Sequence, residues 1–100
     1  MSETMSSKEI IETGLGTIGK VRIIKALAEE NGLVTVYVLH KKTRLKREDI
    51  KNNLDELVRI GWVTQTKYAN VVYGINHQNK YVSRLVEFFN DAGYIGQNDS

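Results

Sequence analysis

An apolar stripe at helical spacing, ended by a glycine and followed by a β-rich stretch, restricts the fold of this chain more than any other feature. Gly61 ends the helix predicted over 47–60, whose stripe consists of Ile50, Leu54, Leu57 and Val58. The segments WVTQTKY and VVYGIN then flank Ala-Asn. They are rich in β-branched and aromatic residues and predict a hairpin. A helix that runs directly into a hairpin indicates an α+β domain.

Further helices are predicted on both sides of this unit. Residues 17–31 have apolar side chains at helical spacing and end at Asn-Gly, a frequent helix stop. Residues 79–92 predict a last helix whose apolar arc of roughly 160° is wider than the ordinary stripe of about 100°. The segment VYVLHKKT, 36–43, is ambiguous, because its β-branched residues favour a strand while Thr35 could cap a short helix. EIIET, 9–13, predicts only a short helical turn.

Composition excludes several classes of protein. One hundred residues with 41% hydrophobic and 26% charged side chains fit a single globular domain. No apolar run approaches the roughly 20 residues that span a bilayer, and the polar start lacks a secretory h-region, so we expect a cytoplasmic protein. The chain has no Cys, and its two His residues, His40 and His77, are far apart. We therefore expect no metal, no cofactor and no enzymatic activity.

The segment GLGTIG, residues 14–19, matches the G-x-G-x-x-G pattern of dinucleotide-binding proteins. That pattern needs a buried strand before it and an acidic residue about 20 positions later, but the preceding segment is short and polar and position 39 is Leu. The alternative interpretation is a lead into the helix at 17–31, with Thr17 as its N-cap.

Positive charge is concentrated in KKTRLKRED, residues 41–49. Five of its first seven residues are Lys or Arg, although the net charge of the chain is only +2. The run is either a solvated loop or a surface that meets phosphate.

The stretch TVYVLHKKTRLKREDIKNNLDELVRIGWV, 35–63, resembles the winged helix-turn-helix of small prokaryotic transcription regulators, the MarR- and ArsR-like proteins. Their pattern has an apolar residue in the second helix, a turn that ends in Leu, and a third helix that ends L-x-x-L-x-x-x-G followed by two apolar residues. The matching residues are Leu39, Leu45, Ile50, Leu54, Leu57, Gly61, Trp62 and Val63. The segment 19–32 is similar to the first helix of many archaeal members.

The resemblance implies an α+β winged helix-turn-helix fold, with a three-helix core, a β-hairpin wing and a C-terminal dimerisation helix. It makes 36–43 a helix. It divides the chain into an N-terminal arm (1–16), a winged helix-turn-helix domain (17–76), a C-terminal helix at a dimer interface (77–95) and a tail (96–100). Three positions depart from the family pattern: His40, Arg44 and Lys46 stand where members often have Ala, Gly, and Ser or Thr.

In such proteins the N-terminus of the third helix points into the major groove. The resemblance therefore implies base or groove contacts by Lys46, Arg47, Lys51 and Asn52. Phosphate contacts would come from Lys41, Lys42, Arg44 and Lys67, with Tyr68 assisting. Glu48 has two interpretations, as a favourable charge at the helix start or as an acceptor for a cytosine amino group. Lys67 could equally be an edge-strand lysine that blocks aggregation.

The last helix also has two interpretations. Its apolar residues either close the core of one chain or form a homodimer interface; they are Tyr81, Val82, Leu85, Phe88 and Phe89. A dimer predicts a near-palindromic site on double-stranded DNA. The alternative function is a winged-helix protein-interaction module within a larger assembly, favoured by the acidic residues of the third helix. The sequence indicates no membrane segment and no particular small-molecule effector.

Overall fold

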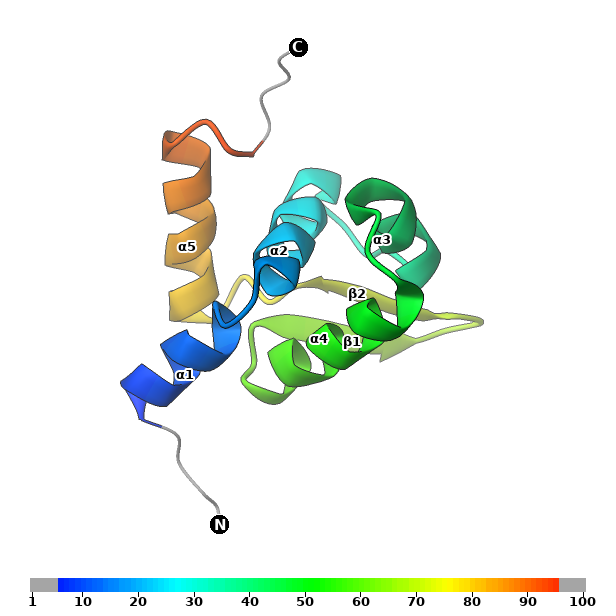
Figure 1. Ribbon diagram of the computed structural model, residues 1–100, viewed down its shortest axis with the longest axis horizontal. Coiled ribbons are helices and arrows are strands. Elements are labelled where there is room, and N and C mark those ends of the chain that lie inside the picture. The colour runs from blue at the N-terminus through cyan, green and yellow to red at the C-terminus, as the bar shows by residue number, and fades with distance from the viewer. Residues whose placement is uncertain (1–5, 96–100) are drawn as a thin grey trace.

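The chain folds as helices followed by a hairpin and a last helix (Figure 1). The computed structural model describes residues 6–95, apart from the side chain of Lys8; residues 1–5 of the predicted arm and the predicted tail, 96–100, lie outside this range. The elements are α1 (Ser7–Gly14), α2 (Ile18–Glu30), α3 (Val36–Thr43), α4 (Arg47–Arg59), β1 (Val63–Lys67), β2 (Val71–Ile75) and α5 (Lys80–Asp91). The segment 36–43 is a helix, as the resemblance implied.

Three helices, α2, α3 and α4, enclose the core. The predicted stripe of α4 faces inward, with Ile50, Leu54 and Leu57 completely buried. The side chains that meet them there include Ile23, Ile24 and Leu27 of α2 and Leu39 of α3. Full burial stabilises each such side chain by roughly 1.5–3 kcal/mol, so this contact fixes α4 in place. The opposite face of α4 is exposed to solvent.

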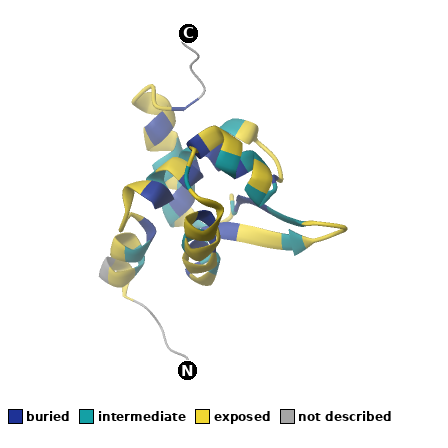
Figure 2. Cartoon of the chain, turned by 45° about the vertical axis from the view of Figure 1, so that its right-hand side comes forward, coloured by how far each residue is buried: buried dark blue, intermediate teal, exposed yellow. Residues whose placement is uncertain are grey.

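The hairpin packs its base on this core and projects its tip. β1 pairs with β2 in antiparallel register, Val63 opposite Ile75 and Lys67 opposite Val71. Val34 and Tyr73 exchange two backbone hydrogen bonds of 2.9 and 2.7 Å, which tie the segment between α2 and α3 to β2. The tip points away from α1 and α5 (Figure 1) and is exposed (Figure 2).

The turn between α3 and α4 accommodates the three departures from the family pattern. Arg44 adopts the left-handed conformation, φ 65°, where glycine is common. His40 Nδ1 lies 2.7 Å from the carbonyl oxygen of Leu45. The Thr43 hydroxyl donates to the carbonyl of Leu39 and accepts from the amide of Leu45, at 2.7 and 3.2 Å. These side-chain hydrogen bonds offset the cost of the left-handed arginine. Lys46 makes no side-chain cap, as expected for lysine at this position.

The N-terminal segment differs from the prediction. Sequence patterns indicated an arm with a short turn at 9–13, but Ser7–Gly14 is a helix closed by a capping box. The Ser6 hydroxyl accepts from the Glu9 amide at 3.1 Å, and the Glu9 carboxylate accepts from the Ser6 amide at 2.9 Å. The helix packs on the domain because Gly14 lies directly against the buried ring of Trp62. The Ser-x-x-Glu spacing of the capping box was the signal that we missed.

Residue Thr17 caps α2, as predicted, by accepting a hydrogen bond from the Lys20 amide at 3.2 Å. The segment before it is a helix, so GLGTIG lacks the preceding strand that a dinucleotide site requires.

Lys20 joins three helices beneath the surface. Its side chain is 6% exposed, and its ammonium donates to the Thr13 carbonyl of α1 at 2.9 Å and to the Glu56 carboxylate of α4. The hydrogen bond from Lys20 holds the pKa of Glu56 below its ordinary value. One buried cation therefore fixes both α1 and α4 on α2.

Candidate nucleic-acid interface

The exposed start of α4 forms the centre of the candidate interface. With the apolar stripe turned inward, the exposed residues of its first three turns are Arg47, Glu48, Asp49, Lys51, Asn52, Asp55 and Glu56. Two of the carboxylates lie in the first turn, where negative charge favours the helix dipole. The structure thus brings the predicted groove residues Arg47, Lys51 and Asn52 together on one rigid, solvent-facing surface.

An exposed aromatic ring, Tyr37, organises the cations beside this surface. Tyr37 lies in the first turn of α3 and is 54% exposed. The Lys41 ammonium lies 5.7 Å from the centre of its ring and the Arg47 guanidinium carbon 5.5 Å. Both are within reach of the attraction between a cation and an aromatic ring. The ring therefore connects α3 to the start of α4.

Sequence patterns did not identify Tyr37 as a site residue. The available signal was its spacing of four from Lys41 within the ambiguous segment 36–43, which places both on one helical face.

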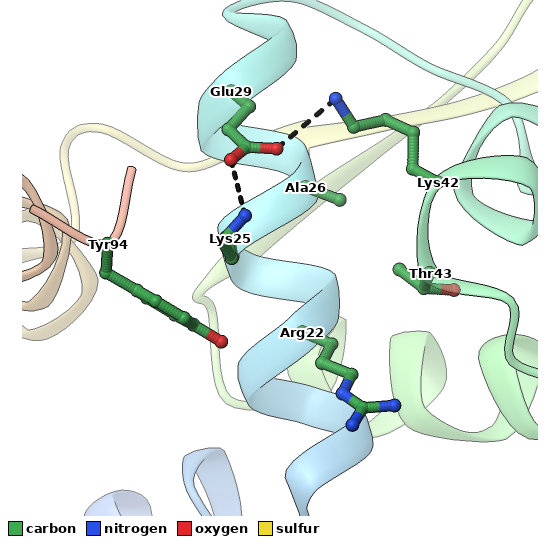
Figure 3. Close-up of a pocket in the computed structure, with 7 residues that line it drawn as sticks. All are labelled: Arg22, Lys25, Ala26, Glu29, Lys42, Thr43 and Tyr94. Carbon is green, nitrogen blue, oxygen red and sulfur yellow. Dashed lines mark hydrogen bonds and ion pairs between the residues drawn. The ribbon is translucent and has the colours of Figure 1, made fainter. Parts of the chain in front are cut away.

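Lys42 differs from its neighbour Lys41. Its ammonium lies 3.0 Å from a carboxylate oxygen of Glu30 and 3.3 Å from one of Glu29, both at the end of α2. Lys25 completes the network at 2.6 Å from Glu29 (Figure 3). The hydrogen bond to Glu30 raises the pKa of Lys42 despite partial burial. A phosphate contact by Lys42, as predicted, would have to replace these ion pairs.

The turn and the wing extend the basic surface on either side of α4. Arg44 and Lys46 are exposed in the turn. Lys67 ends β1 and Tyr68 stands at the hairpin tip, 72% exposed. The tip is closed by a 2.9 Å hydrogen bond from the Tyr68 amide to the Asn70 carbonyl. The predicted wing residues thus lie at the projecting end of the hairpin, where they are open to a large partner.

The C-terminal helix divides its apolar residues between two faces. Val82 is completely buried and Phe89 is 7% exposed; Phe89 packs edge-on against Tyr94, with ring centres 4.9 Å apart. These two residues belong to the core of the chain, and we correct their assignment to a dimer interface. Tyr81 and Leu85 are half-buried, and Phe88 is 62% exposed. These three residues form the outer face of α5, which is accessible to a partner.

No three His, Cys, Asp or Glu side chains among residues 6–95 gather closely enough to hold a metal ion. None of the helices within that range is long and apolar enough to cross a bilayer.

Three features define a winged helix-turn-helix fold. They are the three-helix core, the helix-turn-helix whose second helix has an exposed basic start, and the projecting hairpin. The solved structure of NolR from Sinorhizobium fredii has this fold. It matches with a TM-score of 0.68 over 95% of this chain and 100% of the NolR chain, at 14% sequence identity. No protein-family model matches the sequence, and no curated protein is matched by it. The fold predicted from the resemblance is confirmed, and at this identity the likeness concerns the fold alone.

Proposed function

We propose that this chain binds specific sequences of double-stranded DNA and regulates transcription in the cytoplasm. The start of α4 enters the major groove, and the wing rests on the backbone or in the minor groove. The observation that carries this proposal is the cluster of Tyr37 and Lys41 on α3 with Arg47 at the exposed start of α4, a helix whose opposite face is buried. Similarity in fold to NolR, an ArsR-family winged-helix transcriptional regulator, supports it. We assign the chain no catalytic activity.

Each part of the cluster has a physical role in this proposal. Lys41, Arg44 and Lys67 neutralise phosphates and release counterions, which supplies most of the non-specific affinity. Arg47 and Lys51 reach acceptor atoms of guanine, and Asn52 reaches the edge of adenine. Because the apolar stripe holds α4 in place, these contacts form with little loss of backbone conformational entropy.

A double variant tests the proposal directly. Arg47→Ala combined with Lys51→Ala should abolish specific DNA binding and leave the thermal unfolding transition unchanged, since both side chains are exposed. Arg22→Ala, which removes an exposed arginine from α2 outside the predicted surface, is the matched control. Unchanged DNA affinity in the double variant would contradict the proposal.

We further propose that two chains associate through the outer face of α5, formed by Tyr81, Leu85 and Phe88. An isologous contact would place two recognition helices about one DNA turn apart and would select a near-palindromic site. Leu85→Asp with Phe88→Asp should convert a dimer into a monomer in sedimentation velocity, because a carboxylate there cannot be desolvated cheaply. A wild-type chain that sediments as a monomer would contradict dimerisation.

A second function is favoured by the carboxylates on the exposed side of α4. Glu48, Asp49 and Asp55 are all exposed and would repel phosphate if they approached it closely. They suit a winged helix that docks on a basic protein surface within a larger assembly. This function predicts a stable hetero-complex with only weak DNA binding, so the same double variant would leave the DNA affinity low and unchanged.

A further inference from the structure

Tyr68 differs from the other tyrosines of the chain in having no side-chain partner. Its ring is 72% exposed, and its side chain makes no hydrogen bond, ring contact or cation contact with any residue in the described range, 6–95. Each of the other four has a partner: Arg47 lies against Tyr37, Gln65 donates to Tyr73, Ser7 is hydrogen-bonded to Tyr81, and Phe89 packs on Tyr94. The Tyr68 ring is therefore free to contact another molecule.

The hairpin holds this ring at a braced, projecting tip (Figure 1). Its base is fixed in the core, because Val63 and Ile75 face each other across the two strands and are 2% and 8% exposed. Its end is closed by the 2.9 Å hydrogen bond from the Tyr68 amide to the Asn70 carbonyl. The backbone on both sides of the ring is thus held by hydrogen bonds, and only the side chain has to be ordered on contact.

The charge around the tip favours a polyanion as the partner. No acidic residue stands between Glu56 and Glu87 in the sequence, so the whole hairpin lacks negative charge. Lys67 precedes Tyr68 directly and forms no ion pair within the described part of the chain. An exposed ring beside an uncompensated cation suits nucleic acid, which offers both phosphates and the flat faces of bases.

The dimensions of the hairpin decide which of its parts can enter a DNA groove. Strand β1 has five residues and extends roughly 13 Å from the buried Val63 to Lys67, at about 3.3 Å per residue. That reach exceeds the depth of the minor groove, about 7.5 Å. The groove is only about 6 Å wide, and two strand backbones already lie about 4.8 Å apart, so the ribbon itself stays outside. Only side chains of the tip can reach the groove floor.

We propose that Tyr68 acts as a wedge, whose ring enters the minor groove and inserts partway between two adjacent base pairs, so that the duplex is kinked. This inference rests on the proposed function, because α4 must hold the duplex for the tip to reach it. The aromatic ring replaces part of the stacking that the two base pairs lose, and Lys67 meets a neighbouring phosphate. Pyrimidine–purine steps kink most easily, so Tyr68 adds a sequence preference where no hydrogen bond reads a base.

The test measures affinity and bending on the same DNA with the full-length chain. Two duplexes share one sequence, except that one has a single mismatched base pair at its centre, and each has a donor and an acceptor dye at its two ends. Because a mismatched base is unstacked at lower cost, the wild type should bind the mismatched duplex about tenfold more tightly. Energy transfer between the dyes should rise on binding, since a kink brings the ends closer together.

Variants at the tip separate the ring from the charge. Tyr68→Ala should bind both duplexes with the same affinity and leave energy transfer unchanged, whereas Tyr68→Phe should behave like the wild type because it keeps the ring. Lys67→Ala is the matched control: it should weaken binding to both duplexes equally and retain the preference for the mismatch. Each side chain is exposed, so the thermal unfolding transition should not change.

The outcomes distinguish the wedge from the proposed function. Equal binding of both duplexes by the wild type, with unchanged energy transfer, would overturn the wedge and leave the proposed function intact. A preference for the mismatch that persists in Tyr68→Ala would also overturn it. No binding to either duplex would contradict both proposals and would assign the exposed tip to a protein partner.

Discussion

The guanidinium carbon of Arg47 lies 5.5 Å from the centre of the Tyr37 ring. The contact joins the first residue of α4 to the first turn of α3, so the arginine that we expect in the major groove is positioned by a residue on another helix. Lys41 shares the same ring. The exposed ring is thus part of the proposed DNA-binding surface, although it is neither basic nor on the recognition helix.

Removal of the ring should weaken DNA binding without unfolding the protein. An exposed contact between a cation and an aromatic ring contributes about 0.5–1 kcal/mol, so Tyr37→Ala should reduce DNA affinity by several-fold while Tyr37→Phe retains it. Fluorescence anisotropy with a labelled duplex measures both. If Tyr37→Phe is as weak as Tyr37→Ala, the hydroxyl contacts DNA and the positioning role is wrong.

The two roles considered for Glu48, stabilisation of the start of α4 and recognition of a cytosine, predict different results. As a favourable charge at the start of α4, Glu48→Gln should lower the free energy of unfolding by about 0.3–1 kcal/mol and leave base preference unaltered. Asp49→Asn, in the same turn, should act similarly. Chemical denaturation and site selection from a random library measure the two properties. A variant of Glu48 with wild-type stability and a changed preference at one base pair would show that it reads cytosine.

The Lys20–Glu56 pair predicts a pH dependence. The hydrogen bond from Lys20 lowers the pKa of Glu56 below its ordinary value of 4.5. The pair therefore stabilises the folded state above pH 4.5, and this contribution is lost as the pH falls through the lowered pKa of Glu56. Glu56→Gln should therefore be less stable than the wild type at pH 7, and the difference should shrink below pH 4.5. Glu87→Gln, an exposed carboxyl on α5, is the control. A difference that is constant from pH 7 to pH 3, roughly the range over which carboxyl groups titrate, would exclude this linkage.

The contact between α1 and the core depends on Gly14. A Cβ atom at this position would lie 2.2 Å from a ring carbon of Trp62, so Gly14→Ala must displace either the helix or the indole. We expect a loss of about 1–3 kcal/mol in the free energy of unfolding and a shifted Trp62 emission. Gly32→Ala, where the nearest atom is 3.8 Å away, should change the emission little. Wild-type stability in Gly14→Ala would show that α1 is not packed against Trp62.

Periodicity in the sequence was enough to predict the helices at 17–31, 47–60 and 79–92, and β-branched and aromatic content predicted the hairpin. The helix at 36–43 was predicted only by the family resemblance. Each apolar stripe belongs to a single helix, so its spacing is visible locally. The side-chain partners were not visible in the same way. Lys42 meets Glu30, 12 positions earlier, only because α2 packs beside α3. Arg47 meets Tyr37 only because the turn at Arg44 is left-handed.

The division of α5 into a buried and an exposed apolar face was also not predictable from the sequence. Its wide apolar arc predicted two contacts, but spacing alone could not assign Val82 and Phe89 to the core and Phe88 to the outer face. That division depends on where α2 and the segment around Tyr94 lie, which is a tertiary property.

The most direct measurement is fluorescence anisotropy of the wild-type chain on a random-sequence DNA duplex, titrated at several salt concentrations. If α3, α4 and the wing meet phosphates as proposed, log K should fall with log salt with a slope of about −4 or steeper. Lys41→Ala with Lys67→Ala, which removes two proposed phosphate contacts, should make that slope shallower by up to about 2. No binding tighter than about 10⁻⁴ M, the weak end of ordinary non-specific affinity, would contradict the account and favour the protein-interaction module.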